Sequence, residues 1–207
     1  MPTSDEVWTY RPRSAIPATV AVWLLAAGMT AAQGATGGAA GALRALPFAL
    51  AGALAGWLVF YKPYVRVADS GIHVVNPLRT YDVPWGALVD IRTRFTCTLV
   101  TPNAVVEVFA APGPGRHVAA SATASDLRRP GAGRGSQQLP MDVGELPRSA
   151  SGTVAGVVRR RWQELVETDR LDPGFADVLE VPRSTDGRAL GALVALLVLG
   201  AILVALG

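Results

Sequence analysis

Residues 64–83 read YVRVADSGIHVVNPLRTYDV, and the order of apolar and polar residues in them predicts the fold of the central part of the chain. Apolar and polar residues alternate in YVRVAD and resume their alternation in IHVVN, which is typical of strands that bury one face. Asp69-Ser70-Gly71 and Asn76-Pro77 are turn sequences. The stretch therefore predicts short strands joined by tight turns, with a further short strand over residues 80–83.

The pattern continues toward the C-terminus. Pro84-Trp85 predicts a bend or helical turn, and residues 89–95 (VDIRTRF) alternate again. One face of that run would carry Val89, Ile91, Thr93 and Phe95, and the other Asp90, Arg92 and Arg94. Residues 97–101 and 104–110 are two more apolar, β-branched runs. We expect five to seven short antiparallel strands, arranged as a sandwich or partly open barrel.

A long irregular loop is expected over residues 112–150, which are rich in Gly, Pro, Ser and Arg. Residues 116–121 are a candidate strand within it. The sequence PGAGRGS (residues 130–136) has the glycines of a phosphate-binding loop. It follows no clear strand, opens no helix and holds no lysine, so a phosphate-binding loop is not predicted.

A helix is expected over residues 151–168, with Ser149 or Ser151 as its N-cap. Its apolar residues recur at helical spacing on one face, and they are Val154, Val157, Val158, Trp162, Leu165 and Val166. Asp172-Pro173-Gly174 marks its end. Burial of that face against the sheet would contribute several kcal/mol, at roughly 25 cal/mol per Å² of apolar area.

Three further runs, residues 16–33, 43–60 and 189–207, are almost entirely apolar, and Arg44 is their one charged residue. Each has about 18 residues and would span about 27 Å as a helix, close to the hydrocarbon thickness of a bilayer. The first two are separated only by residues 34–42 and should form a hairpin. We therefore predict a transmembrane hairpin over residues 16–60 and a C-terminal transmembrane helix.

Arginine and lysine predict the orientation of these helices, because positive charge favours the cytoplasmic side. Arg11, Arg13, Lys62, Arg66, Arg183 and Arg188 flank the spans on one side, whereas the hairpin loop offers only Arg44. A plasma-membrane protein is expected, with a cytoplasmic tail (residues 1–15), a cytoplasmic central domain and an extracytoplasmic C-terminus. Trp8, Tyr10, Trp57 and Tyr61 are expected at the membrane interfaces. A signal peptide cleaved near residues 30–32 is the alternative for the first span.

The stretch from Tyr61 to Phe95, with its D-x-G turn and its VPW sequence, resembles the bacterial PH-domain family of actinobacterial membrane proteins. In that family two transmembrane helices precede a pleckstrin-homology-like (PH-like) domain. The resemblance extends from Trp8 to about Phe109 and less specifically to the helix. It implies an α+β PH-like domain over residues 61–171, a small antiparallel sandwich or barrel capped by one C-terminal amphipathic helix. Its marks are three structural residues, Gly71, Pro84 and Trp85, and Trp162 is expected as a structural residue on the buried face of the helix. The linker (residues 172–188) and third span (residues 189–207) then follow; this span and the long loop go beyond the family's pattern.

No arrangement of residues points to an enzyme. The two histidines, His73 and His117, lie on different segments without metal-ligand spacing, and no nucleophile motif is present. Cys97 is the single cysteine, which excludes an intrachain disulfide and a cysteine metal cluster. No catalytic residue, cofactor or metal is therefore expected. The net charge of +3 is modest, and we expect no nucleic-acid partner.

Two functions of different kinds remain open. The first is a binding or scaffold module, which meets a protein partner or anionic lipid through a basic surface of Arg66, Arg79, Arg92, Arg94, Arg159 and Arg160. The second is an accessory subunit of a transport, secretion or division complex that acts through its transmembrane helices. Gly52 and Gly56 form a GxxxG spacing that would allow close helix packing in that case.

Overall fold

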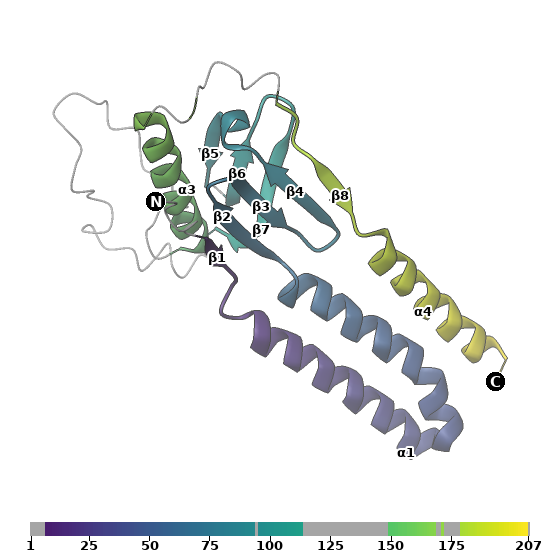
Figure 1. Ribbon diagram of the computed structural model, residues 1–207. Coiled ribbons are helices and arrows are strands. Elements are labelled where there is room, and N and C mark those ends of the chain that lie inside the picture. The colour runs from purple at the N-terminus through teal and green to yellow at the C-terminus, as the bar shows by residue number, and fades with distance from the viewer. Residues whose placement is uncertain (1–6, 94, 114–148, 169–170, 172–178, 207) are drawn as a thin grey trace. The chain divides into compact units, whose positions relative to one another are not determined.

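The computed structural model describes residues 7–93, 95–113, 149–168, 171 and 179–206 (Figure 1). The chain divides into two compact units, each made of segments far apart in the sequence. The first unit, called the β unit here, comprises Met1–Pro12, Tyr64–Val75 and Tyr81–Arg183. The helical unit comprises Arg13–Pro63, Asn76–Thr80 and Ser184–Gly207.

Two antiparallel sheets form the β structure. The first has the order β1-β2-β3-β4-β8, and its strands are Trp8–Tyr10, Tyr64–Ala68, Gly71–Val75, Arg79–Val83 and Arg183–Thr185. The second has the order β5-β6-β7, with strands Asp90–Arg92, Thr96–Val100 and Val105–Pro112. A short 3-10 helix, η2 (Trp85–Ala87), lies between β4 and β5 in the chain. The predicted antiparallel β architecture is confirmed.

Two strands were not expected. β1 lies within the predicted tail, residues 1–15, and β8 lies within the predicted linker, residues 172–188. Each has only three residues, too few for alternation to be recognised, and all three residues of β8 are exposed. Both strands are defined by their pairing in the sheet, which sequence periodicity does not report.

The two aromatic residues of β1 contact the core of the β unit. Trp8 and Tyr10, which we expect at the membrane interface, both pack against the hydrophobic core of the β unit. Trp8 pairs with Val67 and Tyr10 with Val65, both on β2, and the two rings stack with centroids 5.9 Å apart. The pairing of β1 with β2 therefore explains their position.

The alternation over residues 89–95 predicts that Val89 and Phe95, at its two ends, share the buried face, and this is wrong for both. Ile91 and Thr93 are buried as expected, but Val89 is 59% exposed and Phe95 is 79% exposed. β5 covers only Asp90–Arg92, so the regular pleat that the alternation assumes does not extend to either end.

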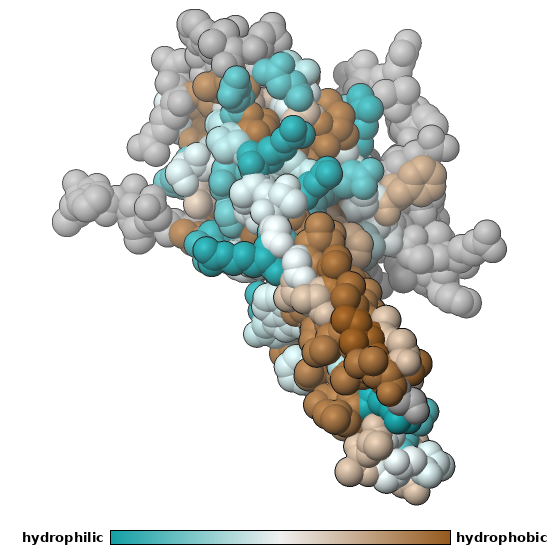
Figure 2. Space-filling view, turned by 90° about the vertical axis from the view of Figure 1, so that its right-hand side faces the viewer, coloured by the Kyte–Doolittle hydropathy of each residue, from teal (hydrophilic) through white to brown (hydrophobic). Residues whose placement is uncertain are grey.

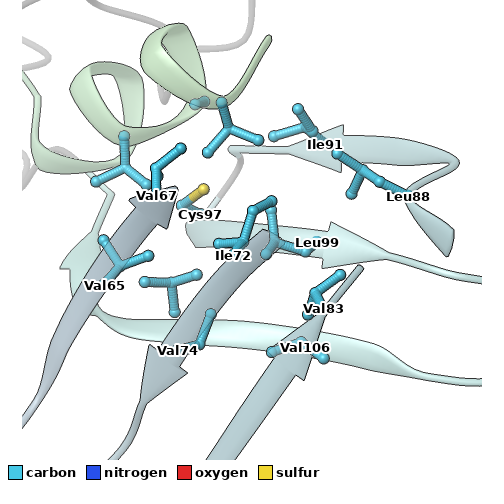
Figure 3. Close-up of a cluster of buried hydrophobic side chains, with 14 of the residues drawn as sticks. Val65, Val67, Ile72, Val74, Val83, Leu88, Ile91, Cys97, Leu99 and Val106 are labelled. Carbon is cyan, nitrogen blue, oxygen red and sulfur yellow. The ribbon is translucent and has the colours of Figure 1, made fainter. Parts of the chain in front are cut away.

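The core of the β unit lies between the strands and the helix α3 (Ala150–Glu167). Figure 3 shows side chains of β2, β3, β4 and the second sheet directed into one cluster, together with the sulfur of Cys97. α3 buries Val154, Val158 and Leu165 of its predicted apolar face. The Ser149 side chain accepts a 2.9 Å hydrogen bond from the Gly152 amide and caps the helix. The predicted strand at residues 116–121 and most of the predicted loop lie outside the described residues.

The helical unit begins with α1 (Ala15–Gly56), which continues into a π-helical turn, η1 (Trp57–Tyr61). α1 is not one straight helix, because Gly38 has a positive φ of 62° and interrupts it. The two limbs fold back on each other, as Figure 1 shows, and Trp23 Nε1 donates to the Ala53 carbonyl at 3.0 Å. α1 is thus a helical hairpin whose bend falls at a glycine, the residue that adopts this φ without strain.

The third apolar run forms α4 (Gly187–Ala205). Two stretches, Ala15–Tyr61 and Gly187–Ala205, are long and apolar enough to cross a membrane. Hydrophobic residues, coloured brown in Figure 2, cover most of the visible helix surface. Apolar side chains of the helical unit, among them Leu24, Leu25 and Val204, are more than half exposed. By length and composition the helices therefore suit a bilayer.

Gly52 and Gly56 differ in the space around their Cα atoms: Gly56 faces another side chain closely, and Gly52 does not. A Cβ at Gly56 would lie 2.7 Å from Val22 Cγ1, so this glycine permits the close approach of the two limbs. A Cβ at Gly52 would meet nothing within 4 Å. Of these two glycines, Gly56 is therefore the one that serves helix packing among the described residues.

Candidate functional site

A groove of about 560 Å³ lies on the exposed face of the first sheet. Its lining includes Val7, Arg66, Ser70, His73, Asp82 and Pro182, and we call it the sheet groove. Alternation along the strands positions its polar side chains. On β2 the neighbours of Arg66 in the chain, Val65 and Val67, point into the core, so Arg66 points outward.

Three adjacent strands place a guanidinium, an imidazole and a carboxylate side by side in this groove. Arg66 on β2 lies directly opposite His73 on β3 in the antiparallel pairing. His73 Nδ1 in turn contacts Asp82 Oδ1 on β4. The side chains of His73 and Asp82 are 34% and 62% exposed, so the row is accessible to a partner. The groove therefore offers both signs of charge and donors as well as acceptors.

Predicted structural residues build one end of the groove. Gly71, at the start of β3, has a φ of 148°, and a Cβ there would lie 2.8 Å from the Val83 carbonyl oxygen. Pro84 is extended and directs the chain into η2. Trp85 is 4% exposed and its Nε1 donates to the Ala68 carbonyl at 2.9 Å. Gly71 and Trp85 thus hold the β2–β3 turn against the end of β4.

The six predicted arginines of the basic surface lie on different elements. Arg66 lines the sheet groove, and Arg160 lines a smaller crevice of about 350 Å³ beside α3. Arg92 Nε lies 3.0 Å from Asp90 Oδ2, and Arg159 Nη2 donates to the Ile91 carbonyl at 2.9 Å. Arg79 belongs to the helical unit. Arg94 lies outside the described residues. Arg92 and Arg159 each bind a different residue of β5, Asp90 and Ile91 respectively.

One ion pair that the sequence did not reveal ties α3 to the β2–β3 turn. Arg161 Nη1 donates to Glu164 Oε2 at 2.8 Å, and Arg161 Nη2 donates to Asp69. Hydrogen bonds to Glu164 and to Asp69 raise the pKa of Arg161. The partners Asp69 and Arg161 are far apart in the sequence, and no local pattern connects them. Nearby on the helix, Trp162 is partly buried, and its Nε1 has no hydrogen-bond partner among the described residues.

The groove brings polar side chains from several strands together. Ser70, His73 and Asp82 share its lining, but no hydrogen bond joins Ser70 to His73 in the described part of the chain. No cluster of three metal-ligating side chains occurs among the described residues. What the groove presents is a set of side chains able to pair with a polar ligand.

Comparison with known families finds one match. Residues 62–130, about a third of the chain, match the family described as Bacterial PH domain. The match begins just before β2, covers all strands through β7 and leaves out α3. No curated protein and no solved structure is similar to the chain at a significant level. The chain therefore contains a bacterial PH-like domain with antiparallel sheets, accompanied by a long N-terminal and a C-terminal apolar helix.

Proposed function

We propose that this PH-like domain is a non-enzymatic binding or scaffold module, held at the plasma membrane by the helical unit, that receives a protein partner in the sheet groove. The family match supports the general role, since a PH domain is a recognition module. A fold alone does not name the ligand, so the choice of partner depends on the groove.

The observation that carries this choice is the mixed charge of the groove. Arg66 and His73 are joined there by Asp82, whose carboxylate contacts the imidazole. An anionic headgroup would meet the Arg66 guanidinium and also this carboxylate, and like charges at close range disfavour binding. A polypeptide can satisfy both signs with its own side chains and backbone amides. A protein partner therefore fits the groove better than an anionic lipid surface.

Membrane attachment is supported by the helices and by their connections. Residues 11–14 alone separate β1 from α1, residues 62–63 separate η1 from β2, and residue 186 separates β8 from α4. If α1 and α4 cross the bilayer, such short connections keep the module at the membrane surface. The flanking arginines and Lys62 favour the cytoplasmic side for the module and the extracytoplasmic side for the bend at Gly38. This keeps the groove close to partners at the same membrane.

The test uses the full-length chain, because a fragment such as residues 64–171 would lack β1 and β8 of the first sheet. A photo-crosslinking residue is placed at Ser70, in the groove, and for comparison at Arg92, on the second sheet. Crosslinking in membranes followed by mass spectrometry should give a discrete protein adduct at Ser70 and none at Arg92. Arg66→Glu should abolish the Ser70 adduct, whereas Arg92→Glu should leave it unchanged.

A second variant distinguishes this proposal from the accessory-subunit alternative, and copurification of the crosslinked partner is its readout. α4 exposes Gly191, where a Cβ would meet nothing within 4 Å, so Gly191→Leu alters the helix surface without disturbing the chain's own packing. Loss of the copurified partner with Gly191→Leu, together with retention in Arg66→Glu, would assign recognition to the helices and reject the groove.

A further inference from the structure

An apolar crevice of about 570 Å³ lies within the helical unit. It is bounded by both limbs of α1 and by α4, with Val22 and Met29 from the first limb, Phe48 from the second and Val204 from α4. Its volume lies within the range of small-molecule sites, about 300–1,000 Å³. Apolar walls of this kind suit a hydrocarbon chain.

Arg44 is the charged residue among the mostly apolar residues that line this crevice. It is the one charged residue between Arg13 and Lys62, and it lines the crevice from the second limb. Its side chain is partly buried, and it makes no hydrogen bond or ion pair with any residue that the structure describes. An arginine at hydrocarbon depth costs several kcal/mol unless it reaches water or an anion. Gln33, on the facing limb, lines the same crevice and adds an amide donor.

The depth of Arg44 indicates which anion it would meet. Arg44 follows the bend at Gly38 by six residues, about 9 Å along the helix axis at 1.5 Å per residue. That distance puts the guanidinium within reach of the headgroup region of the leaflet where the hairpin turns. The phosphates of lipids occupy this region, and arginine binds phosphate through paired N–H donors.

We propose that the crevice is a binding site for one anionic phospholipid, with the phosphate bound by Arg44 and Gln33 and an acyl chain between the two limbs of α1 and α4. This inference rests on the membrane insertion in the proposed function, but not on the sheet groove. Charge complementarity favours a lipid over a partner helix, because a helix would need its own acid at the same depth.

The role of the Arg44 charge is tested with the full-length chain in nanodiscs of phosphatidylcholine that contain a titrated fraction of phosphatidylglycerol. Lipid that copurifies after release into mild detergent is measured by native mass spectrometry. Wild type should retain one phosphatidylglycerol in preference to phosphatidylcholine, and Arg44→Gln should weaken this retention tenfold or more. Arg13→Gln removes one charge at the opposite end of the same limb pair and should have no effect. Equal retention by the two variants, or equal retention of the two lipids, overturns the proposal.

The crevice is tested with a matched pair of glycines. Gly52 lines the crevice, and a Cβ there meets nothing within 4 Å, so Gly52→Leu fills the space without a clash at the backbone. Gly28 is equally open but does not line the crevice, so Gly28→Leu is the control. Gly52→Leu alone should lower retention of phosphatidylglycerol; if both variants retain it as wild type does, the acyl chain is not in the crevice. Failure of the wild-type chain to enter nanodiscs would reject membrane insertion itself, whereas insertion without lipid preference rejects only this site.

Discussion

Lys62 Nζ lies 2.6 Å from Asp186 Oδ2, and it also donates to the Pro77 carbonyl at 3.0 Å. Lys62 directly follows η1, and Asp186 is the N-cap of α4, where its side chain accepts from the Ala189 amide at 3.0 Å. The Asp186 amide donates to the Leu78 carbonyl at 2.9 Å. One acid and the chain's one lysine therefore join the end of the hairpin, the β3–β4 turn and the start of α4 within the helical unit.

Removal of this link should destabilise the attachment of α4. In Asp186→Ala the helix loses its N-cap and Lys62 loses its partner, and a lost N-cap alone costs about 0.5–2 kcal/mol. Thermal unfolding of the full-length chain in detergent should show a lower midpoint. Lys62→Met, which keeps the cap, should lower the midpoint less than Asp186→Ala does. Equal midpoints for Asp186→Ala and wild type would show that the link contributes no stability.

The same pair predicts a dependence on pH. The hydrogen bond from Lys62, followed by that from the Ala189 amide, lowers the pKa of Asp186 below its ordinary value of 3.8. A carboxyl group with a lower pKa in the folded state adds stability above its unfolded pKa, and that stability is lost as the pH falls through the folded pKa. The gap in unfolding midpoint between wild type and Asp186→Asn should therefore be present at pH 7 and shrink below about pH 4. A gap that stays constant down to pH 2 would contradict this assignment.

The sequence predicts those features of the fold that depend on residues close together in the chain. The strands β2 and β3 and the helix α3 follow from local periodicity, because alternation and helical spacing report which face is buried. The apolar helices likewise follow from local composition. The hairpin bend was expected within residues 34–42, and Gly38 lies there. Each of these features is encoded within about 20 consecutive residues.

The candidate sites, in contrast, depend on pairing between distant segments. Arg66 was expected on a basic surface, but its actual neighbours His73 and Asp82 are set by the register of β2, β3 and β4. Lys62 and Asp186 are separated by 124 positions and share no local pattern. Arg44 was recognised as a lone charge, yet the crevice that it lines is formed by both limbs of α1 together with Val204 of α4. Sequence spacing does not report such contacts.

Cys97 should be unreactive until the β unit unfolds. Its side chain is fully buried, and this burial raises the pKa of its thiol to about 12, although Arg159 opposes the shift. Because the thiolate is the reactive form, iodoacetamide at pH 8 should label native protein very slowly and denatured protein quickly. The neutral thiol stabilises the fold below its unfolded pKa, and this contribution is lost as the pH rises toward 12. Rapid labelling of the native protein, monitored by mass spectrometry, would show that the core opens readily.

Gly71 should be among the least replaceable residues of the β unit. Its φ of 148° is strained for any residue with a side chain, and a Cβ would lie 2.8 Å from the Val83 carbonyl, which belongs to backbone and cannot move aside cheaply. Gly71→Ala should therefore lower the free energy of unfolding by about 1–3 kcal/mol. Gly156 provides the matched control, since it lies in α3 and a Cβ there meets nothing within 4 Å. Gly156→Ala should raise stability by about 0.5–1 kcal/mol through helix propensity. Denaturant unfolding followed by circular dichroism compares the two, and a Gly71→Ala variant as stable as Gly156→Ala would show that the β2–β3 turn tolerates another conformation.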